Sequence, residues 1–339
     1  MRILSGIQSS GKLHIGNYFG AIAQFLEMQS SGNECLIFIA DLHALTTVRD
    51  ANKLRELTRD VALDYLALGL DPTREDVALF RQSDIPEVTE LMWLLLSITP
   101  MAMLENAHSY KDKIAKGISP DAGLFTYPVL MAADILAYDS DEVPVGRDQQ
   151  QHLEMARDIA VKFNQTFDPT YRDRLNAAKG REDVHGILKL PRARIQESTA
   201  VVLGIDGQKM SKSYANTIDL FGEDKPTQKR IMSIKTDSTP VEAPKDTNTP
   251  LHALLKLFAS PEEMIEINKS FQEGGKGYGH YKQRLAELFF ERFGAARAKR
   301  RELEKDPAAV DAVLAKGAER ARDHARIVLD RARRAVGIR

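Results

Sequence analysis

Residues 2–17 read RILSGIQSSGKLHIGN, and this stretch decides the fold. Its apolar start, residues 2–7, predicts a short buried strand that runs into a polar loop of glycine and serine. From Ile15 to Leu26, apolar residues recur every three to four positions, which predicts a helix with one apolar face. A strand, a glycine-containing loop and a helix in this order indicate the first unit of a parallel α/β sheet, with a helix start that favours anions.

Segments further along the chain repeat this alternation. Strands are predicted at residues 36–40, 77–80 and 141–145, and helices at 54–66 and 149–163. Strands separated by helices at this spacing predict an α/β fold with a doubly wound, Rossmann-like parallel sheet. Residues 86–138 are more helical and interrupt the pattern as an insertion. Residues 164–208 are irregular except for a strand-like segment at 200–205.

Beyond Thr217 the strand signals disappear. Helices are predicted at residues 251–259, 261–271, 281–293, 295–305 and 307–336. The chain is therefore expected to divide into a Rossmann-like domain, residues 1–215, and an all-helical domain, residues 216–339. The last helix is a candidate for packing back on the first domain.

The composition narrows the class of protein. The chain has 339 residues, of which 43% are hydrophobic, enough to bury a core. No apolar run approaches the roughly 18 residues of a membrane span, and the short apolar start meets polar residues too early for a signal peptide. The single cysteine, Cys35, excludes an intrachain disulfide and a multi-cysteine zinc or iron–sulfur site. These features predict a cytoplasmic protein with no membrane partner.

The net charge of −1, from 47 Lys+Arg against 48 Asp+Glu, hides an asymmetry along the chain. Residues 282–339 hold 16 basic and 9 acidic residues, or +7, so residues 1–281 hold 31 and 39, or −8. A basic tail on an acidic body is typical of a polyanion-binding segment, but a solvated basic helix face explains it equally well.

The loop after the first strand allows two interpretations. The spacing from Gly6 to Gly11-Lys12 matches a phosphate-binding P-loop, but Leu13 stands where that motif needs a hydroxyl for magnesium. The second interpretation uses residues 14–17, His-Ile-Gly-Asn, at the start of the helix. Gly16 allows a ligand to approach the backbone, while His14 and Asn17 can bind polar groups of a nucleotide.

A second charged segment lies far downstream, at residues 209–213. It reads Lys-Met-Ser-Lys-Ser and follows an Asp-Gly turn. Two lysines and two hydroxyls can stabilise the extra charge of a phosphate as pyrophosphate departs, although a solvated loop has the same composition. Together with His14-Ile15-Gly16-Asn17, this segment resembles the two signature motifs of the class I aminoacyl-tRNA synthetases.

Further motifs narrow the resemblance to the bacterial tryptophanyl-tRNA synthetases, and it covers residues 2–337. They are DLHALT at 41–46, TYPVLMAADIL at 126–136, VGRDQQQH at 145–152, TDS at 236–238 and GKGYG at 275–279. The resemblance implies tryptophan–tRNA ligase activity: L-tryptophan and ATP give tryptophanyl-adenylate and pyrophosphate, and tryptophan then passes to the 3′ end of tRNA(Trp). No side-chain nucleophile is needed, because positioning and charge stabilisation carry such a reaction.

The same resemblance assigns a tryptophan pocket. Asp134 would accept the indole N–H, and Met131, three residues earlier on one helix face, would pack on the ring. A buried acceptor penalises phenylalanine, which would leave it unpaired. Met131 alone is more typical of core packing than of a binding site, whereas Asp134 interrupts an apolar helix and is harder to explain that way. The remaining expected pocket residues are His43, Tyr127, Val143, Val145 and Gln149.

The resemblance also assigns the ATP site. The residues implied to bind ATP are Gln8, Ser9, Ser10, Gly16 and Asn17 in the first loop, Gly146, Arg147 and Asp148 at the ribose, Val201 or Val202 at the adenine, and Lys209, Met210, Ser211, Lys212 and Ser213 at the phosphates. Those implied to be catalytic are His14, Asn17, Lys209 and Lys212. Mg²⁺ would arrive with the ATP phosphates, and no protein-bound metal is expected.

The partners implied by the resemblance are L-tryptophan, ATP, tRNA(Trp) and a second copy of the chain. The insertion at residues 86–138 would form the homodimer interface, and the helical domain would bind the anticodon. Three alternatives stay open: a tyrosyl-tRNA synthetase-like enzyme, a P-loop NTPase, and a non-enzymatic RNA-binding module. Exchange of pyrophosphate into ATP, driven by tryptophan or by tyrosine, would separate them.

Overall fold

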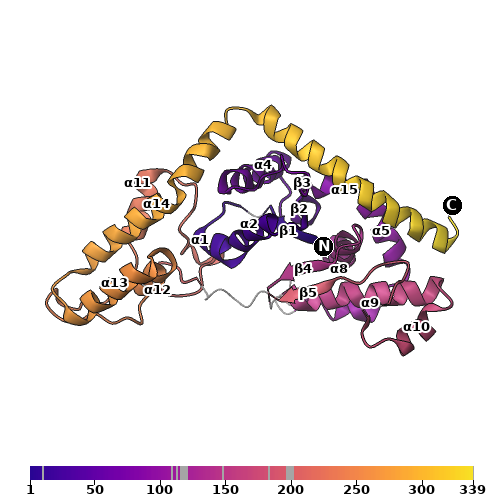
Figure 1. The fold of residues 1–339 in the computed structure, drawn as a ribbon, viewed down its shortest axis with the longest axis horizontal. Coiled ribbons are helices and arrows are strands. Elements are labelled where there is room, and N and C mark those ends of the chain that lie inside the picture. The colour runs from indigo at the N-terminus through magenta and orange to yellow at the C-terminus, as the bar shows by residue number, and fades with distance from the viewer. Residues whose placement is uncertain are drawn as a thin grey trace.

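The computed structural model describes residues 1–9, 11–107, 110–111, 114, 121–146, 149–181, 184–195 and 202–338. These residues form a five-stranded, all-parallel sheet in the order β3-β2-β1-β4-β5 (Figure 1). The strands are β1 (Arg2–Gln8), β2 (Glu34–Ala40), β3 (Val77–Arg81), β4 (Glu142–Val145) and β5 (Arg192–Ile195). The predicted doubly wound sheet is confirmed.

The sheet opens between the neighbouring strands β1 and β4. β1 pairs with β2 along its whole length, from Arg2 to Gln8, but it pairs with β4 only at Ile3, opposite Glu142. The order of the strands reverses at this point, and ligands of such sheets bind in the crevice outside the carboxyl ends. The topology therefore places a crevice beside the loop that follows β1.

Alternate strand residues point to opposite sides of the sheet, and apolar residues lie on both sides. Helices therefore cover both faces. Ile3 and Ile37 face a core shared with α1, α2 and α4, whereas Leu4 and Leu36 face a core shared with α5, α8 and α9. The helices of the first face are α1 (Ile15–Asn17), a π-helical turn (Tyr18–Ile22), α2 (Ala23–Met28) and α4 (Ala51–Leu68). Those of the second face and the insertion are α5 (Pro86–Leu96), α6 (Met101–Glu105), α8 (Ala122–Leu136) and α9 (Gln150–Phe167). Shorter elements are α3 (Asp41–Ala44) and 3-10 turns at Gln29–Ser31, Gln82–Asp84 and Lys212–Tyr214.

Residues 164–208 are more regular than the sequence predicts. They contain α10 (Tyr171–Ala177) and the edge strand β5. The strand-like segment predicted at 200–205 is not a strand of the sheet among the described residues: Leu203 only forms an isolated bridge with Lys209. The sequence of β5 is Arg-Ala-Arg-Ile, and an edge strand with charged side chains lacks the apolar run on which the prediction depended.

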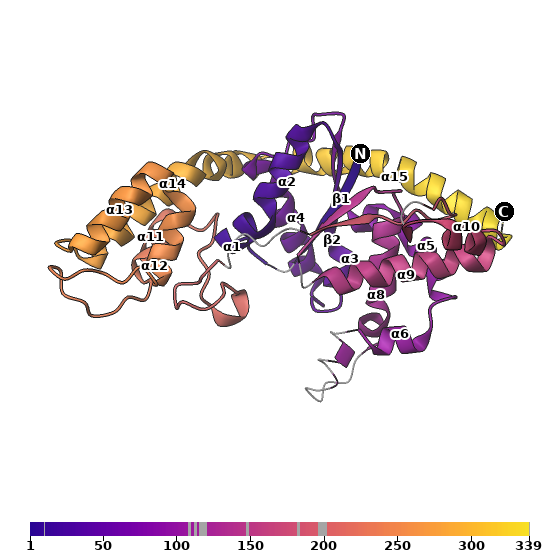
Figure 2. The ribbon, with the colours of Figure 1, turned by 60° about the horizontal axis from the view of Figure 1, so that its bottom comes forward.

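The second half of the chain is helical as predicted, with two differences. Its helices are α11 (Asp224–Met232), α12 (Pro250–Phe258), α13 (Pro261–Glu273), α14 (Tyr278–Leu303) and α15 (Pro307–Val336). α11 was not predicted, and α14 is one continuous helix where two were expected. Figure 2 shows α11–α13 gathered around α14, away from the sheet. Among the described residues, none of the helices is both long and apolar enough to cross a membrane.

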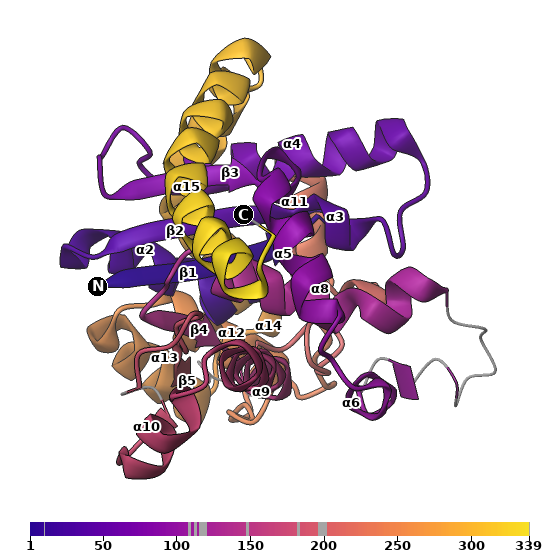
Figure 3. The same ribbon diagram turned by 90° about the vertical axis from the view of Figure 1, so that its right-hand side faces the viewer.

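The last helix, α15, returns across α5 and the edge strand β3 (Figure 3). Gly317 lets the two backbones approach closely, since a Cβ added there would lie 2.0 Å from the carbonyl oxygen of Leu79. One turn later, the guanidinium of Arg320 donates to the carbonyl oxygens of Arg74 (2.7 Å) and Val77 (2.9 Å). α15 therefore covers the exposed edge of the sheet, which is otherwise a site for unwanted strand pairing.

Basic side chains of α14 and α15 meet acidic side chains of the sheet domain. The ion pairs are Arg300 with Asp60 and Asp64, Arg322 with Glu87, Arg331 with Asp139, and Arg333 with Glu90. His324 also lies 2.7 Å from Glu34. Much of the basic excess of residues 282–339 is therefore used inside the molecule, a role that neither interpretation of the charge asymmetry included.

Candidate active site

A cavity of about 730 Å³ lies at the carboxyl ends of the strands, where β1 and β4 separate. It extends between the first loop, α3 and α8. Nine of the residues expected from the sequence line it: Gln8, His43, Tyr127, Met131, Asp134, Val143, Val145, Gly146 and Gln149. Side chains that are distant in the sequence therefore share one site because the ends of parallel strands meet at one edge.

Gly6 and Phe38 shape one wall of this cavity. They are paired neighbours on β1 and β2. A Cβ added at Gly6 would lie 2.5 Å from the ring of Phe38, so only glycine leaves space for the ring in this position. The pairing gives the cavity an aromatic wall next to the crevice.

Asp134 is the buried charge of the site. Its side chain is 1% exposed, yet it lines the cavity from α8. The amide nitrogen of Gln82 donates to both carboxylate oxygens at 2.8 Å, and Nε2 of His43 lies 2.9 Å from Oδ2. Burial raises the pKa of Asp134, while hydrogen bonds from His43 and Gln82 act in the opposite direction. Asp134 is thus a hydrogen-bond acceptor held inside a largely apolar cavity.

Aromatic and sulfur-containing side chains stand beside this carboxylate. Met131 precedes Asp134 by one helical turn, and both line the cavity. Tyr127, one turn earlier, has its hydroxyl 2.6 Å from Nε2 of His152 on α9. The rings of His43 and Tyr127 are in edge contact, with centroids 6.3 Å apart. The arrangement suits a flat aromatic ligand with a single hydrogen-bond donor.

His14 begins the helix that follows the first loop. It is 6% exposed, and burial, then the charge of Lys212, lowers the pKa of His14 to about 4. Its Nδ1 atom has no hydrogen-bond partner among the described residues. The Oδ1 atom of Asn17 accepts the backbone N–H of His14 at 3.0 Å. Gly16 leaves room for the ring, because a Cβ there would lie 2.9 Å from Nδ1. His14 is therefore a neutral imidazole at pH 7 with one ring nitrogen available.

The structure brings residues 209–213 to this helix start. The N–H of Ile15 donates to the carbonyl oxygen of Ile218, and that of Leu220 to Leu13, both at 3.0 Å. Met210 is buried against Gly16, with its Cβ 3.5 Å from the position of an added Cβ. These contacts join two motifs that the sequence separates widely.

The lysines and serines of the second motif lie at the surface of this junction. Nζ of Lys212 lies 3.4 Å from the position of a Cβ at Gly11, beside the first loop. Burial lowers the pKa of Lys212, and the nearby carboxylates of Asp219 and Asp64 oppose that shift. Lys209 is exposed, and the hydroxyl of Ser211 accepts the N–H of Ser213 at 3.3 Å. A cationic group thus faces the loop where phosphate binding is expected.

Some expected site residues are not placed at the cavity. Ser9 is fully buried and is not among the residues that line it; the hydroxyl of Thr58 donates to the Ser9 hydroxyl at 3.4 Å. Ser10, Arg147, Asp148 and Val201 lie outside the described residues. Val202 is buried, and its carbonyl oxygen accepts the N–H of Met210 at 2.9 Å.

Sequence reasoning missed several residues of the site. Phe38, Thr46, Thr47 and His152 line the cavity, and Gln82 binds Asp134 from behind it. Two of these residues could have been identified from the sequence. His152 lies in the quoted motif at residues 145–152, and Gln82 is a polar residue directly after a buried strand, where parallel sheets place their functional side chains.

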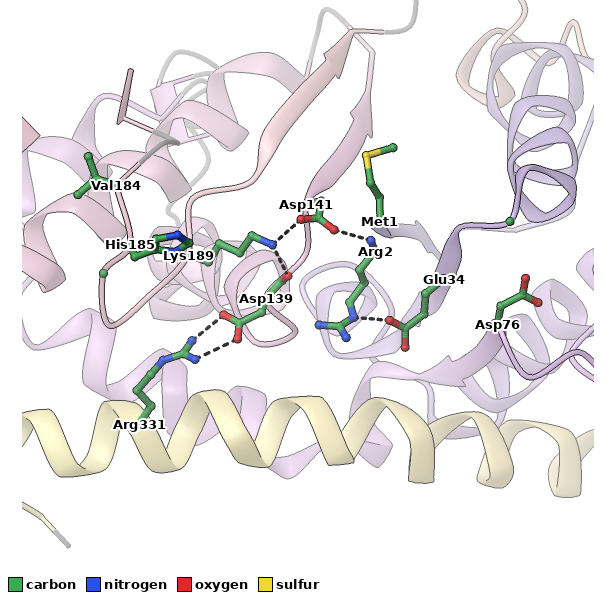
Figure 4. A pocket seen from close by; sticks show the side chains of 12 residues that line it. Met1, Arg2, Glu34, Asp76, Asp139, Asp141, Val184, His185, Lys189 and Arg331 are labelled. Carbon is green, nitrogen blue, oxygen red and sulfur yellow. Dashed lines mark hydrogen bonds and ion pairs between the residues drawn. The ribbon is translucent and has the colours of Figure 1, made fainter. Parts of the chain in front are cut away.

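A second cavity, of about 650 Å³, lies at the opposite, amino-terminal edge of the sheet. Ion pairs line it, as Figure 4 shows: Arg2 with Glu34, Lys189 with Asp141, and Arg331 with Asp139. The charges within each pair neutralise one another, and the pair of Arg331 with Asp139 attaches α15 to the sheet domain. The cavity at the carboxyl edge is therefore the candidate active site. Within the described part of the chain, no cluster of three or more His, Cys, Asp or Glu side chains could hold a metal ion.

Comparisons with known proteins agree with this assignment. Residues 1–304 match the family of class I tRNA synthetases for tryptophan and tyrosine. The tryptophan–tRNA ligase of Rhodopirellula baltica is 54% identical over 340 residues, covering 100% of both chains. That of Fusobacterium nucleatum is 50% identical, covering 99% of this chain and 98% of its own.

The solved structures lead to the same family. The tryptophanyl-tRNA synthetase of Campylobacter jejuni, in complex with ADP and tryptophan, superposes with a TM-score of 0.88 at 46% identity, covering 99% of this chain and 100% of the other. These findings confirm the predicted resemblance and favour tryptophan over tyrosine. The chain belongs to the class I tRNA synthetases for tryptophan and tyrosine, and within them it is an aminoacyl-tRNA synthetase that acts on tryptophan.

Proposed function

We propose that the cavity binds L-tryptophan beside ATP, so that the tryptophan carboxylate attacks the α-phosphorus and pyrophosphate leaves. The 3′ end of tRNA(Trp) then accepts the tryptophanyl group. The observation that carries the proposal is Asp134, a buried acceptor in an apolar cavity, one helical turn from Met131. The Campylobacter jejuni relative, solved with ADP and tryptophan, supports tryptophan and an adenine nucleotide as the ligands.

Asp134 selects the amino acid in this proposal. Indole has a single polar group, an N–H donor, inside a large apolar ring system. A side chain that lacks this donor leaves the buried carboxylate unpaired, which is costly. His43, Tyr127 and Met131 enclose the ring, with the remaining expected contacts at Val143, Val145 and Gln149.

The phosphates lie between the two signature motifs. Gln8, His14, Gly16 and Asn17 contact ATP from the first loop, and the support for His14 is that its buried Nδ1 has no hydrogen-bond partner among the described residues. Lys209 and Lys212 stabilise charge on the departing pyrophosphate, assisted by Met210, Ser211 and Ser213. Ser9, Ser10, Gly146, Arg147, Asp148 and Val201 complete the expected nucleotide site. Mg²⁺ enters bound to the ATP phosphates and not to a protein cage.

The remaining partners follow from the two-domain organisation, with residues 1–215 catalytic and 216–339 binding the anticodon. The insertion at residues 86–138 pairs two copies of the chain. Two exposed apolar side chains on it support this interface: Trp93 on α5 is 69% exposed and Met101 on α6 is 61% exposed. The dimer works in the cytoplasm, where the buried Cys35 stays reduced.

Amino-acid-dependent exchange of pyrophosphate into ATP tests this function. We expect exchange with tryptophan, and little with tyrosine or without an amino acid. Asp134→Asn should raise the KM for tryptophan about 10- to 100-fold, the scale of losing one hydrogen bond to a charged group. Glu87→Gln is the control, because Glu87 is also a buried carboxylate but binds Arg322 outside the cavity. Equal KM values in the two variants would refute the role of Asp134.

A further inference from the structure

Gln82 is a fully buried residue that the mechanism above does not use. It directly follows β3 and begins the 3-10 turn at Gln82–Asp84. Both ends of its amide are hydrogen-bonded. Nε2 donates to the two carboxylate oxygens of Asp134 at 2.8 Å each, and Oε1 accepts the backbone N–H of Leu42 at 3.1 Å. The backbone N–H of His43 points to the same oxygen at 3.4 Å.

These partners fix the direction of the amide. The N–H groups of Leu42 and His43 can only donate, so they require the oxygen of Gln82 on their side. The NH₂ group must then face Asp134. Gln82 consequently presents donors, and never an acceptor, to the carboxylate. His43 differs, since an imidazole can change its tautomer and so exchange donor for acceptor.

This geometry determines what Asp134 can offer to a ligand. An ionised carboxylate is purely an acceptor, with about four lone-pair positions. Gln82, which does not line the cavity, and His43, which does, occupy some of these positions, and Asp134 itself lines the cavity. A protonated Asp134 would direct a hydroxyl against the NH₂ of Gln82 or into the site. Donors from Gln82 therefore favour the ionised form and hold the carboxylate in one orientation.

We propose that Gln82 is a positioning residue for substrate selection, which keeps Asp134 an oriented acceptor so that the cavity discriminates aromatic side chains by an N–H donor. The proposal rests on the proposed tryptophan site. Gln82 touches no substrate. Its hydrogen bonds connect the end of β3 and the start of α3 to the Asp134 carboxylate on α8, so three separate elements determine where this acceptor lies.

The test compares tryptophan with a β-(benzothiophen-3-yl)alanine probe, in which sulfur replaces the indole N–H in a ring of nearly the same shape. In Gln82→Glu, one oxygen can still accept the Leu42 N–H, while the other faces Asp134 as a second acceptor. Two facing carboxyl groups share a proton, and Asp134 loses its role as a pure acceptor. We expect the ratio of kcat/KM for tryptophan over the probe to fall about tenfold or more in pyrophosphate exchange, mainly through the KM for tryptophan.

A second variant and a control separate positioning from general damage. Gln82→Met keeps the length of the side chain but removes its donors without adding charge, and it should lower the same ratio. Gln29→Glu is the matched control. Gln29 is also buried, and its amide joins Gly69 O (2.9 Å) to the Asp71 N–H (3.0 Å) away from the cavity. Its ratio should equal that of the unmodified enzyme, even if its melting temperature falls.

The outcomes are distinct. Loss of discrimination in both Gln82 variants, with the control unchanged, supports the proposal. Equal losses of kcat/KM for tryptophan and for the probe would make Gln82 merely structural and overturn it. If Asp134→Asn also keeps the discrimination of the unmodified enzyme, the proposed role of Asp134 fails first. If one Gln82 variant melts below the assay temperature, the other Gln82 variant is titrated directly with tryptophan and with the probe, and the two affinities are compared.

Discussion

Replacing Gly317 by alanine tests the contact between α15 and the edge of the sheet. In an ordinary helix interior this change stabilises a protein by about 1 kcal/mol, because alanine is the better helix former. At Gly317, however, the new Cβ would lie 2.0 Å from the carbonyl oxygen of Leu79 and 2.7 Å from its carbonyl carbon. Both are backbone atoms of β3, so neither can rotate away.

The size of the effect follows from these distances. An ordinary contact requires the helix to move by about 1 Å or more, which makes the site overpacked at a cost of about 1–3 kcal/mol. The same movement weakens the two hydrogen bonds from Arg320 to the carbonyl oxygens of Arg74 and Val77, worth about 1–2 kcal/mol together. After the gain in helix propensity, the free energy of unfolding should fall by about 1–4 kcal/mol.

Gly294→Ala is the matched control. Gly294 lies inside α14, and no atom lies within 4 Å of its added Cβ. Thermal unfolding should therefore show shifts of opposite sign, with Gly317→Ala lower and Gly294→Ala higher by about 1 °C. Hydrogen exchange should speed up along α15 only in the first variant. If both changes raise the melting temperature equally, the close approach of α15 to β3 does not exist in solution.

Three further predictions concern catalysis, pH and assembly. Lys212→Ala should lower the kcat of pyrophosphate exchange about 10²–10³-fold with little change in tryptophan binding by titration, and unchanged activation kinetics would remove its assigned role. The pKa of His14, lowered to about 4 from an ordinary 6.5, means that only the unfolded chain takes up this proton between those values. Stability should be lost as the pH falls from about 6.5 towards 4, and denaturation at pH 7 and 5 should show a smaller loss in His14→Asn. Trp93→Glu should shift sedimentation from dimer to monomer, and a dimer of unchanged affinity would exclude α5 from the interface.

The sheet domain was predictable from the sequence where its strands are apolar and its loops carry unusual residues. β2 and β3 are nearly continuous apolar runs, and β1 carries Ile3, Leu4 and Ile7 before a polar loop, so the existence and parallel arrangement of these strands followed from pattern alone. Residues 14–17 and 209–213 could be paired only through the resemblance to a family, because no local pattern shows that they touch. The roles of the individual site residues stay predictions for the assays above.

Features that depend on tertiary contacts could not be predicted from the sequence. β5 is an edge strand whose charged residues give no apolar signal. Two helices were expected on either side of Gly294, yet α14 continues through it, because one glycine costs a helix only about 1 kcal/mol and the buried Phe293 and Arg297 flank it. Gln82 is a single polar residue without a motif, and its importance depends on Leu42 and Asp134, which only the fold brings near. The partners of the basic tail were hidden in the same way.

The long sequence separation between α15 and β3 has a consequence for how the protein folds during synthesis. Arg320 binds carbonyl groups next to β3 across 243 and 246 positions of sequence, so the edge of the sheet is left open until α15 has been synthesised. Loops of that length close late, after local structure has formed. A nascent chain stalled before residue 307 would lack α15. It would expose the edge of β3, and its acidic side chains would lack the basic partners that α15 supplies. The sheet domain therefore depends for one of its edges on a helix that is made long after its own strands, and α15 acts as a late closing element of the fold.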